Sequence, residues 1–218
     1  MSEEQGREAE KPLVNDTPVD AEREAKLKAA AEARAARTAA KEKAEASAAE
    51  TVPELPKAPS PKQPELDKLA ALIKQEIAES AVEDFYLNEL NGDMPILIIN
   101  NRYWREVAKL LKEHEELKFN YLRNVSGVDY ETHMEVVYHL LSLDSKREAA
   151  MKLRTDRDAA SVFSATPVWA TANWNEREIY DLLGVDFPGH PDMRRIMMPD
   201  DWVGHPLRKD YEPIDPEV

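Results

Sequence analysis

Hydrophobic residues between positions 64 and 154 follow two different periods, and each period predicts a different kind of element. Apolar residues recur at helical spacing from Leu66 to Ile77, which predicts an amphipathic helix over residues 65–79. A second set with this spacing predicts a helix from Tyr103 to Leu111, with Asn100 or Asn101 as its cap. The first half of this region therefore supplies two helices with one apolar face each.

Extended segments separate and follow these helices. Asn91-Gly92-Asp93 predicts a hairpin-type turn, and Asp144-Ser145 predicts another. The apolar segments around these turns read as five strands, at 83–90, 94–100, 118–129, 134–143 and 147–154. The order helix, two strands, helix, three strands predicts an α+β fold. We expect a two-layer sandwich, a mixed five-stranded sheet with two helices on one face, plus an extended C-terminal segment.

Residues 1–63 have no such pattern. Residues 21–50 are rich in alanine, glutamate and lysine, which favours helix, yet they carry no apolar stripe that could dock one. Five prolines then follow between Val52 and Pro64 and predict a semi-rigid linker. We therefore divide the chain into a disordered or helical extension (1–63), an α+β domain (64–172) and a capped helix with an extended, partner-wrapping C-terminal segment (173–218).

The last part opens with a helix-forming sequence, "ANWNEREIYDLLG". Asn173 and Glu176 have the spacing of a capping box, Arg177 and Asp181 have the spacing of a helical ion pair, and Gly184 ends the pattern. These features predict a capped surface helix whose charged side chains lie in solvent.

The segment from Phe187 to Tyr211 is too rich in proline and glycine for a long helix or strand. It carries Trp202 and several methionines, which disordered tails usually lack. Its apolar side chains are too few to offset the entropy of ordering it by their own burial. Hydrogen bonds and charge pairs must supply the rest, on the chain's own body or on another protein. We expect a partner to supply them.

Composition excludes several classes of function. A net charge of -14 over 218 residues does not suit nucleic-acid binding. The absence of cysteine excludes disulfides, thiolate zinc sites and cysteine-ligated iron–sulfur clusters in this chain. The N-terminus is charged and does not resemble a signal peptide, and the apolar run Met94–Ile99 is far shorter than the roughly 20 residues that span a bilayer.

One catalytic hypothesis stays open at this point. His190 and His205, with Asp192, Asp200 and Asp201, are residue types that bind metals, although their spacing matches no known ligand motif. A stand-alone acidic, metal-dependent hydrolase could use these histidines with Glu176, Glu178 and Asp181.

The residues from Glu176 to Tyr211 resemble a known family. The patterns E-R-E-x-x-D-x-x-G, F-x-x-H-P-D-x-R-R-I and D-W-x-G-H-P-L-R-K-D-Y follow one another here. This succession resembles the C-type, or 30 kDa-type, subunit of proton-pumping respiratory complex I, and its relatives in photosynthetic complexes and membrane-bound hydrogenases. The resemblance implies a two-layer α+β sandwich followed by an extended C-terminal segment.

It also implies a role without catalysis. The family's members belong to the hydrophilic arm of a donor:quinone oxidoreductase, bind no cofactor, and pack on the quinone-site (D-type) subunit and on neighbours such as the B-type subunit. Iron–sulfur clusters and quinone lie on partner subunits, and the chain is peripheral on the cytoplasmic side of the cell membrane. On this basis Arg194, Arg195, Arg208 and Lys209 would anchor the segment, Trp202 would be an apolar plug, and His190 and His205 would form hydrogen bonds. The other expected partner-binding residues are Glu176, Arg177, Glu178, Asp181, Asp200, Asp201 and Tyr211.

Overall fold

The structure, a computed structural model, describes residues 60–212. These described residues belong to one compact unit. The predictions for the extension at 1–63 fall on residues that, except for 60–63, lie outside the described part of the chain.

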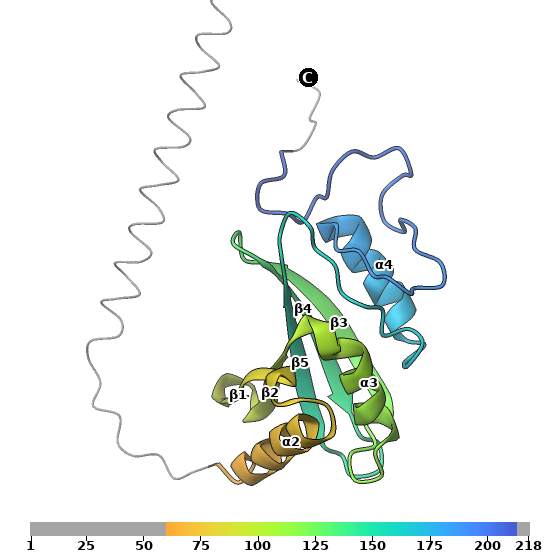
Figure 1. The fold of residues 1–218 in the computed structure, drawn as a ribbon. Helices are drawn as coiled ribbons and strands as arrows, with labels where there is room; N and C mark the ends of the chain where they lie inside the picture. The colour runs from red at the N-terminus through yellow and green to blue at the C-terminus, as the bar shows by residue number, and fades with distance from the viewer. Residues whose placement is uncertain (1–59, 213–218) are drawn as a thin grey trace, which may run out of the picture. The chain divides into compact units, whose positions relative to one another are not determined.

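A mixed five-stranded sheet forms one layer, with the spatial order β1-β2-β5-β4-β3 (Figure 1). The pairing of β2 with β5 is parallel, and the other three pairings are antiparallel. The predicted mixed sheet is thus confirmed. The strands are β1 (Val82–Asn88), β2 (Met94–Ile99), β3 (Tyr121–Asp129), β4 (Met134–Leu141) and β5 (Glu148–Thr155).

The helices are also close to their predicted positions. They are α2 (Gln63–Glu76), α3 (Trp104–Glu113) and α4 (Ala172–Leu183), and three short 3₁₀ turns lie at Glu79–Ala81, Glu89–Asn91 and Asn101–Tyr103. The side chain of Asn100 accepts a hydrogen bond from the Arg102 N–H and so caps the turn that leads into α3. The strand expected from 118 begins at Tyr121, because Lys118 takes a left-handed conformation with φ 44°.

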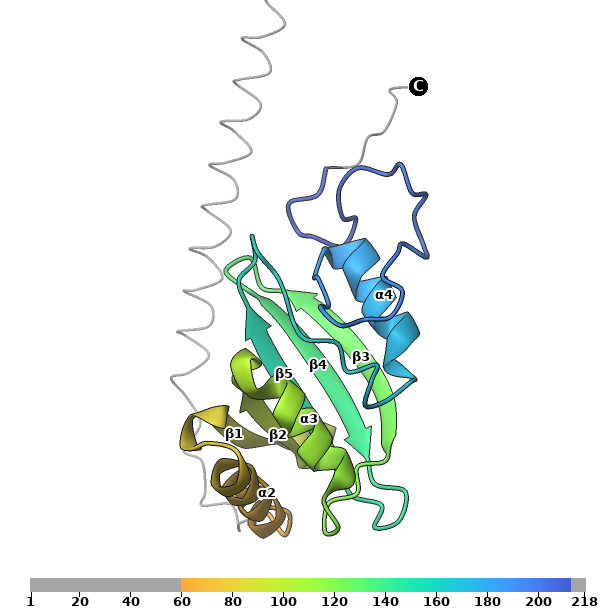
Figure 2. The same cartoon turned by 45° about the vertical axis from the view of Figure 1, so that its right-hand side comes forward.

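All three helices pack on one face of the sheet, whereas the sequence predicted two (Figure 2). Tyr138 of β4 contacts Trp104 of α3, with ring centroids 4.5 Å apart. Val125 lies opposite Tyr138 in the neighbouring strand, so Val125 and Gly127 point to the same face. A Cβ atom on Gly127 would lie 2.6 Å from the Leu183 side chain, so α4 approaches this face closely. One hydrophobic core therefore continues from α2 to α4 and on to Phe187.

Candidate interaction site

The charged residues of α4 are buried, which corrects the prediction of a surface helix. Glu176 and Asp181 are fully buried, and Arg177 is nearly so. The predicted capping box is also wrong, since Thr171 precedes the helix and makes no side-chain cap. Glu176 instead turns to the loop before α4, where it accepts hydrogen bonds from Ser164 Oγ at 2.6 Å, Ala165 N at 2.7 Å and Thr166 Oγ1 at 3.0 Å. Burial raises the pKa of Glu176, and these three hydrogen bonds offset part of that rise.

Arg177 and Asp181 do not pair with each other, again contrary to the prediction. The Arg177 guanidinium lies 4.8 Å from the centre of the Trp174 ring, and its Nε donates to the carbonyl of Arg194 at 3.2 Å. Asp181 pairs instead with Arg195, at 2.8 Å. Both residues of α4 thus hold the segment that follows the helix, which we call the C-terminal segment (residues 185–212).

Asp181 is the first of two buried carboxylates that hold the C-terminal segment. Its Oδ2 accepts three consecutive backbone hydrogen bonds, from Ile196, Met197 and Met198, at 2.9, 2.7 and 2.9 Å. Burial alone raises the pKa of Asp181, but these N–H groups and Arg195 outweigh burial, and the pKa is lowered. Asp181 is therefore a charged acceptor whose hydrogen-bonding capacity is filled by its own chain.

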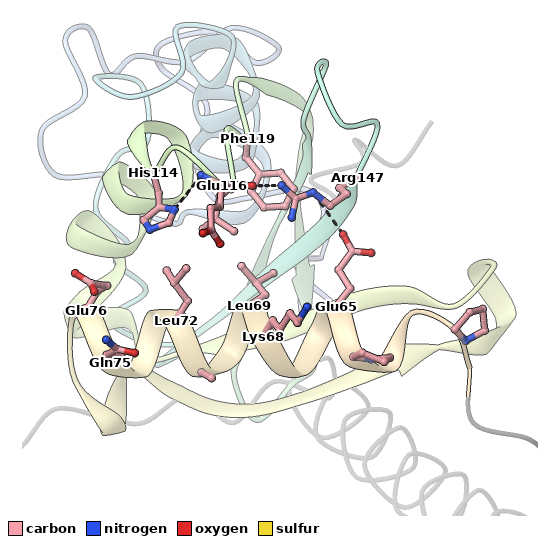
Figure 3. A pocket seen from close by; sticks show the side chains of 14 residues that line it. Glu65, Lys68, Leu69, Leu72, Gln75, Glu76, His114, Glu116, Phe119 and Arg147 are labelled. Carbon is pink, nitrogen blue, oxygen red and sulfur yellow. Dashed lines mark hydrogen bonds and ion pairs between the residues drawn. The ribbon is translucent and has the colours of Figure 1, made fainter.

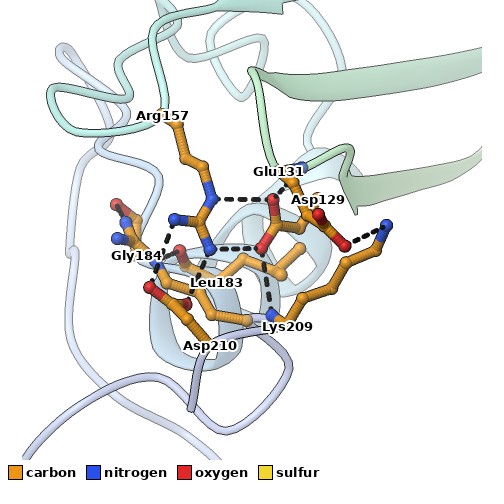
Figure 4. A network of polar contacts seen from close by, with 8 residues as sticks. Asp129, Glu131, Arg157, Leu183, Gly184, Lys209 and Asp210 are labelled. Carbon is orange, nitrogen blue, oxygen red and sulfur yellow. Dashed lines mark hydrogen bonds and ion pairs between the residues drawn. The ribbon is translucent and has the colours of Figure 1, made fainter. Parts of the chain in front are cut away.

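The second buried carboxylate is Asp129, at the end of β3 (Figure 4). Arg157 binds it in a fork, with Nε 2.9 Å from Oδ1 and Nη2 2.8 Å from Oδ2. Lys209 N donates to the same carboxylate at 3.0 Å, and Arg157 also pairs with Asp210 at 2.6 Å. The Arg157 guanidinium is the main reason why the pKa of Asp129 lies well below its usual range. Sequence reasoning named neither Asp129 nor Arg157, because nothing local links Asp129 to partners 28 and 80 positions away.

The basic residues of the segment satisfy the carbonyl groups at the end of α4. His205 Nδ1 donates to the Asp181 carbonyl at 2.9 Å, and Arg208 Nε donates to the Leu183 carbonyl at 2.7 Å. The Leu207 N–H donates to the Leu182 carbonyl at 2.9 Å. These carbonyl groups would otherwise have no partner inside the helix, and cations are favoured at this end of its dipole. Gly184 permits the close approach, since its φ is 73° and a Cβ would lie 2.5 Å from the His205 ring.

The remaining predicted residues lie further out. His190 donates from Nε2 to the Asn173 carbonyl at 3.2 Å. Trp202 and Tyr211 are half-buried, and their polar atoms (Nε1 and OH) have no hydrogen-bond partner among the described residues. The exposed members of the predicted set are Glu178, Arg194, Asp200, Asp201 and Lys209.

Exposed apolar side chains accompany these charges. Met197, Val203 and Leu207 are 63%, 75% and 59% exposed, and Trp174 of α4 is 65% exposed. We call Met197, Val203 and Leu207 the apolar tips of the C-terminal segment. The backbone N–H groups of Met197 and Leu207 are held by the contacts above, and Arg195 Nη2 donates to the Gly204 carbonyl, next to Val203, at 3.2 Å. The three side chains face outward. A surface of this kind is typical of a protein–protein contact.

The predicted site residues form neither a metal site nor the lining of the groove beside α2. Within 60–212, no cluster of three or more His, Asp or Glu side chains is arranged to hold a metal ion. A groove of about 680 Å³ lies between α2 and residues 114–119, with Leu69, Leu72 and Phe119 among its lining (Figure 3). None of the predicted site residues lines it.

No helix in the described part of the chain is long and apolar enough to cross a membrane.

Several known proteins are similar to this chain. The family described as "Respiratory-chain NADH dehydrogenase, 30 Kd subunit" matches residues 97–217. The C-type subunit of an NADH-quinone oxidoreductase from Roseiflexus sp. (strain RS-1) is 42% identical over 148 residues, 66% of this chain and 80% of that protein. The C-type subunit from Chlorobium phaeobacteroides is 45% identical over 126 residues, 56% of this chain and 76% of that protein.

A solved structure shares the fold. It is a chain of the membrane-bound sulfane sulfur reductase, described as an archaeal respiratory membrane complex, with a TM-score of 0.55 and 22% identity. The match covers 68% of this chain and 86% of that chain. The family match confirms the resemblance first inferred from Glu176 to Tyr211. The chain belongs to the family of 30 kDa-type subunits of respiratory-chain NADH dehydrogenase.

Proposed function

We propose that this chain is a non-catalytic structural subunit of the hydrophilic arm of a donor:quinone oxidoreductase. Its C-terminal segment docks on the quinone-site subunit, the D-type subunit of such complexes, with the B-type subunit as a further neighbour. The chain is then peripheral, on the cytoplasmic side of the membrane, and touches the bilayer through the assembly. The names of its relatives support membership of such an oxidoreductase.

This proposal rests on the conformation of the C-terminal segment. Several of its backbone N–H groups and the side chains of Arg195 and Arg208 turn inward to α4 and β3, while its apolar tips turn outward. A segment built for self-contained stability would bury these tips, because each gains free energy when it leaves water. Their exposure on a fixed backbone instead suits a partner with complementary apolar hollows.

The fourteen residues expected to bind a partner accordingly take two roles. An inner set holds the segment on the body: Glu176, Arg177, Asp181, His190, Arg195, His205 and Arg208. An outer set is available to the quinone-site subunit: Glu178, Arg194, Asp200, Asp201, Trp202, Lys209 and Tyr211. Trp202 and Tyr211 belong to the outer set because their side chains are half-buried and, unlike those of the inner set, make no hydrogen bond to the described residues.

Electron transfer is then left to other chains. Iron–sulfur clusters need thiolate ligands in most proteins, and this sequence has no cysteine to supply them. The hydrolase hypothesis finds no support in the geometry, since the carboxylates of Asp181 and Glu176 each accept hydrogen bonds from four donors. The fold shared with the sulfane sulfur reductase chain favours a second candidate, a subunit of a related membrane-bound complex such as a hydrogenase.

Exchange of the apolar tips for carboxylates tests the proposal. We expect Val203→Asp combined with Met197→Asp to abolish co-purification of the full chain with the quinone-site subunit, while the chain stays folded by circular dichroism. A matched control places carboxylates on exposed apolar residues elsewhere, Leu143→Asp and Phe163→Asp, at 46% and 43% exposure. Co-purification that survives the first pair as well as the second would contradict docking through the C-terminal segment.

A further inference from the structure

Strand β3 forms one edge of the sheet, beside helix α4 (Figure 2). Near its start, Thr171 Oγ1 donates to the Leu122 carbonyl at 3.5 Å. At its end, Asp129 is held by Arg157 and Lys209. Between these points, within the described residues, no hydrogen bond joins the outer backbone groups of 124–128 to another segment. In a paired edge strand, every second residue directs its N–H and C=O away from its neighbour.

A groove runs along this open stretch. Its volume is about 220 Å³, and residues 124–127 of β3 form one wall. The other wall consists of residues of α4 with Leu207 of the C-terminal segment. Because the groove is lined by successive residues of the strand, it lies against the backbone edge. It is therefore open to a chain that runs beside β3.

The opposite edge of the sheet is protected against such pairing, and β3 is not. Strand β1 carries the successive exposed carboxylates Glu83 and Asp84, and Asp84 Oδ1 accepts the Phe85 N–H at 2.8 Å. Charges and locally satisfied N–H groups are the usual means by which edge strands avoid intermolecular pairing. The stretch from Asn124 to Val128 contains neither charged residues nor proline.

We propose that residues 124–128 of β3 receive an extended segment of a neighbouring subunit, which adds a sixth strand to the sheet. This inference rests on the proposed function, because the neighbour is a member of the same assembly. Hydrogen bonds between the two backbones hold the added strand, and its alternate side chains select it. One of these side chains is apolar and enters the groove between Leu182 and Leu207.

The charge of the groove restricts further which segment of a neighbouring subunit can bind there. Glu178 is the ionisable side chain that lines the groove, it is exposed, and it forms no ion pair with any of residues 60–212. The added segment thus carries a lysine or arginine opposite Glu178. Strand β3 of a second copy of this chain is a poor candidate for the added strand. Its residues 124–128 are uncharged and offer no basic side chain to Glu178.

A charge reversal at Glu178 tests the selection of the segment. Co-expressed with tagged wild-type chain, a Glu178→Lys chain should enter the purified assembly about fivefold less often, because like charges oppose the encounter. The matched control is Glu115→Lys, an exposed carboxylate in the loop after α3. Equal incorporation of the two variants would contradict the prediction that the added segment carries a basic residue opposite Glu178.

Amide hydrogen exchange tests the strand pairing itself. Wild-type chain is labelled free and within the purified assembly, and residues 124–128 are then read by fragmentation mass spectrometry. We expect every second amide to exchange quickly in the free chain and all to be protected in the assembly. Protection that already appears in the free chain and rises with its concentration would overturn the proposal in favour of a second copy.

The two proposals fail in different ways. A chain that enters the assembly while the same alternate amides stay unprotected would overturn the added strand and leave the proposed function standing. A chain that never co-purifies with the assembly would overturn both.

Discussion

The α+β body and the C-terminal segment are held in place by different physical means. In the body, large side chains such as Trp104, Tyr138 and Leu97 are fully buried in one core. In the segment, backbone N–H groups and arginines converge on two buried carboxylates, Asp129 and Asp181. Apolar burial is non-directional and insensitive to pH, whereas charge-assisted hydrogen bonds depend on geometry and protonation. The C-terminal segment can therefore be ordered while its apolar tips stay exposed for a partner.

The largest expected effect falls on the body. Trp104→Ala removes a ring that contacts both Tyr138 and Trp169. We expect it to lower the free energy of unfolding by about 3–5 kcal/mol, the usual cost of deleting a large aromatic side chain from a core. Urea denaturation followed by circular dichroism measures this loss. A loss well under 1 kcal/mol would contradict the assignment of Trp104 to the centre of the core.

Acidification should affect the segment before the body. The pKa values of Asp129 and Asp181 are lower in the folded state than the ordinary 3.8. Such groups stabilise the fold above their unfolded pKa, and this contribution is lost as pH falls toward their folded pKa. We therefore expect proteolysis within residues 190–209 to accelerate below pH 4 while the far-ultraviolet circular dichroism persists. Glu176, whose pKa is raised, works in the opposite direction, because its protonation as pH falls relieves the cost of burying its charge.

Neutralising one carboxylate should have part of this effect at neutral pH. Asp181→Asn keeps the shape of the side chain but weakens four hydrogen bonds to residues 195–198. Because a hydrogen bond to a charged group contributes about 1.5–3 kcal/mol, we expect local opening of the segment to become easier by roughly 2 kcal/mol. Native-state hydrogen exchange measures this change. Asp192→Asn, which removes an exposed carboxylate beside Arg194, is the control and should change little.

A smaller effect is expected at the junction of the two regions. Gly184 has φ 73°, and a side chain there meets the His205 ring. We expect Gly184→Ala to cost about 1–2 kcal/mol, since it combines left-handed strain with displacement of His205. The melting temperature should fall modestly, and exchange at Leu207, bonded to the Leu182 carbonyl, should quicken. An unchanged melting temperature together with unchanged exchange would show that the close packing of His205 on Gly184 is not needed.

Sequence reasoning succeeded where a feature depends on local pattern. Helix α2, predicted over 65–79 and found at Gln63–Glu76, and the strand Met94–Ile99 were predictable because periodicity and turn residues determine such elements within a few positions. The end of α4 at Gly184 was predictable for the same reason.

Prediction from the sequence failed where a residue can bind either a local or a distant partner. Glu176 and Asp181 fit the rules for a capping box and a helical ion pair, yet Glu176 binds the loop 10–12 residues earlier and Asp181 binds Arg195, 14 residues later. Nothing in the sequence indicated that Asp129 and Arg157 hold the C-terminal segment. For this reason the order of the segment was expected to depend on a neighbouring protein. A carboxylate at a strand end reads as an ordinary turn residue until the fold brings Lys209 to it.

One measurement tests most directly whether the C-terminal segment is ordered before it meets a partner. Amide exchange of Ile196, Met197, Met198 and Lys209, which donate to Asp181 and Asp129, is followed in the free full-length chain at neutral pH. We predict that all four amides exchange at least about a hundredfold more slowly than unprotected amides. Unprotected exchange of these amides in the free chain, with protection only in the assembly, would contradict a preformed segment.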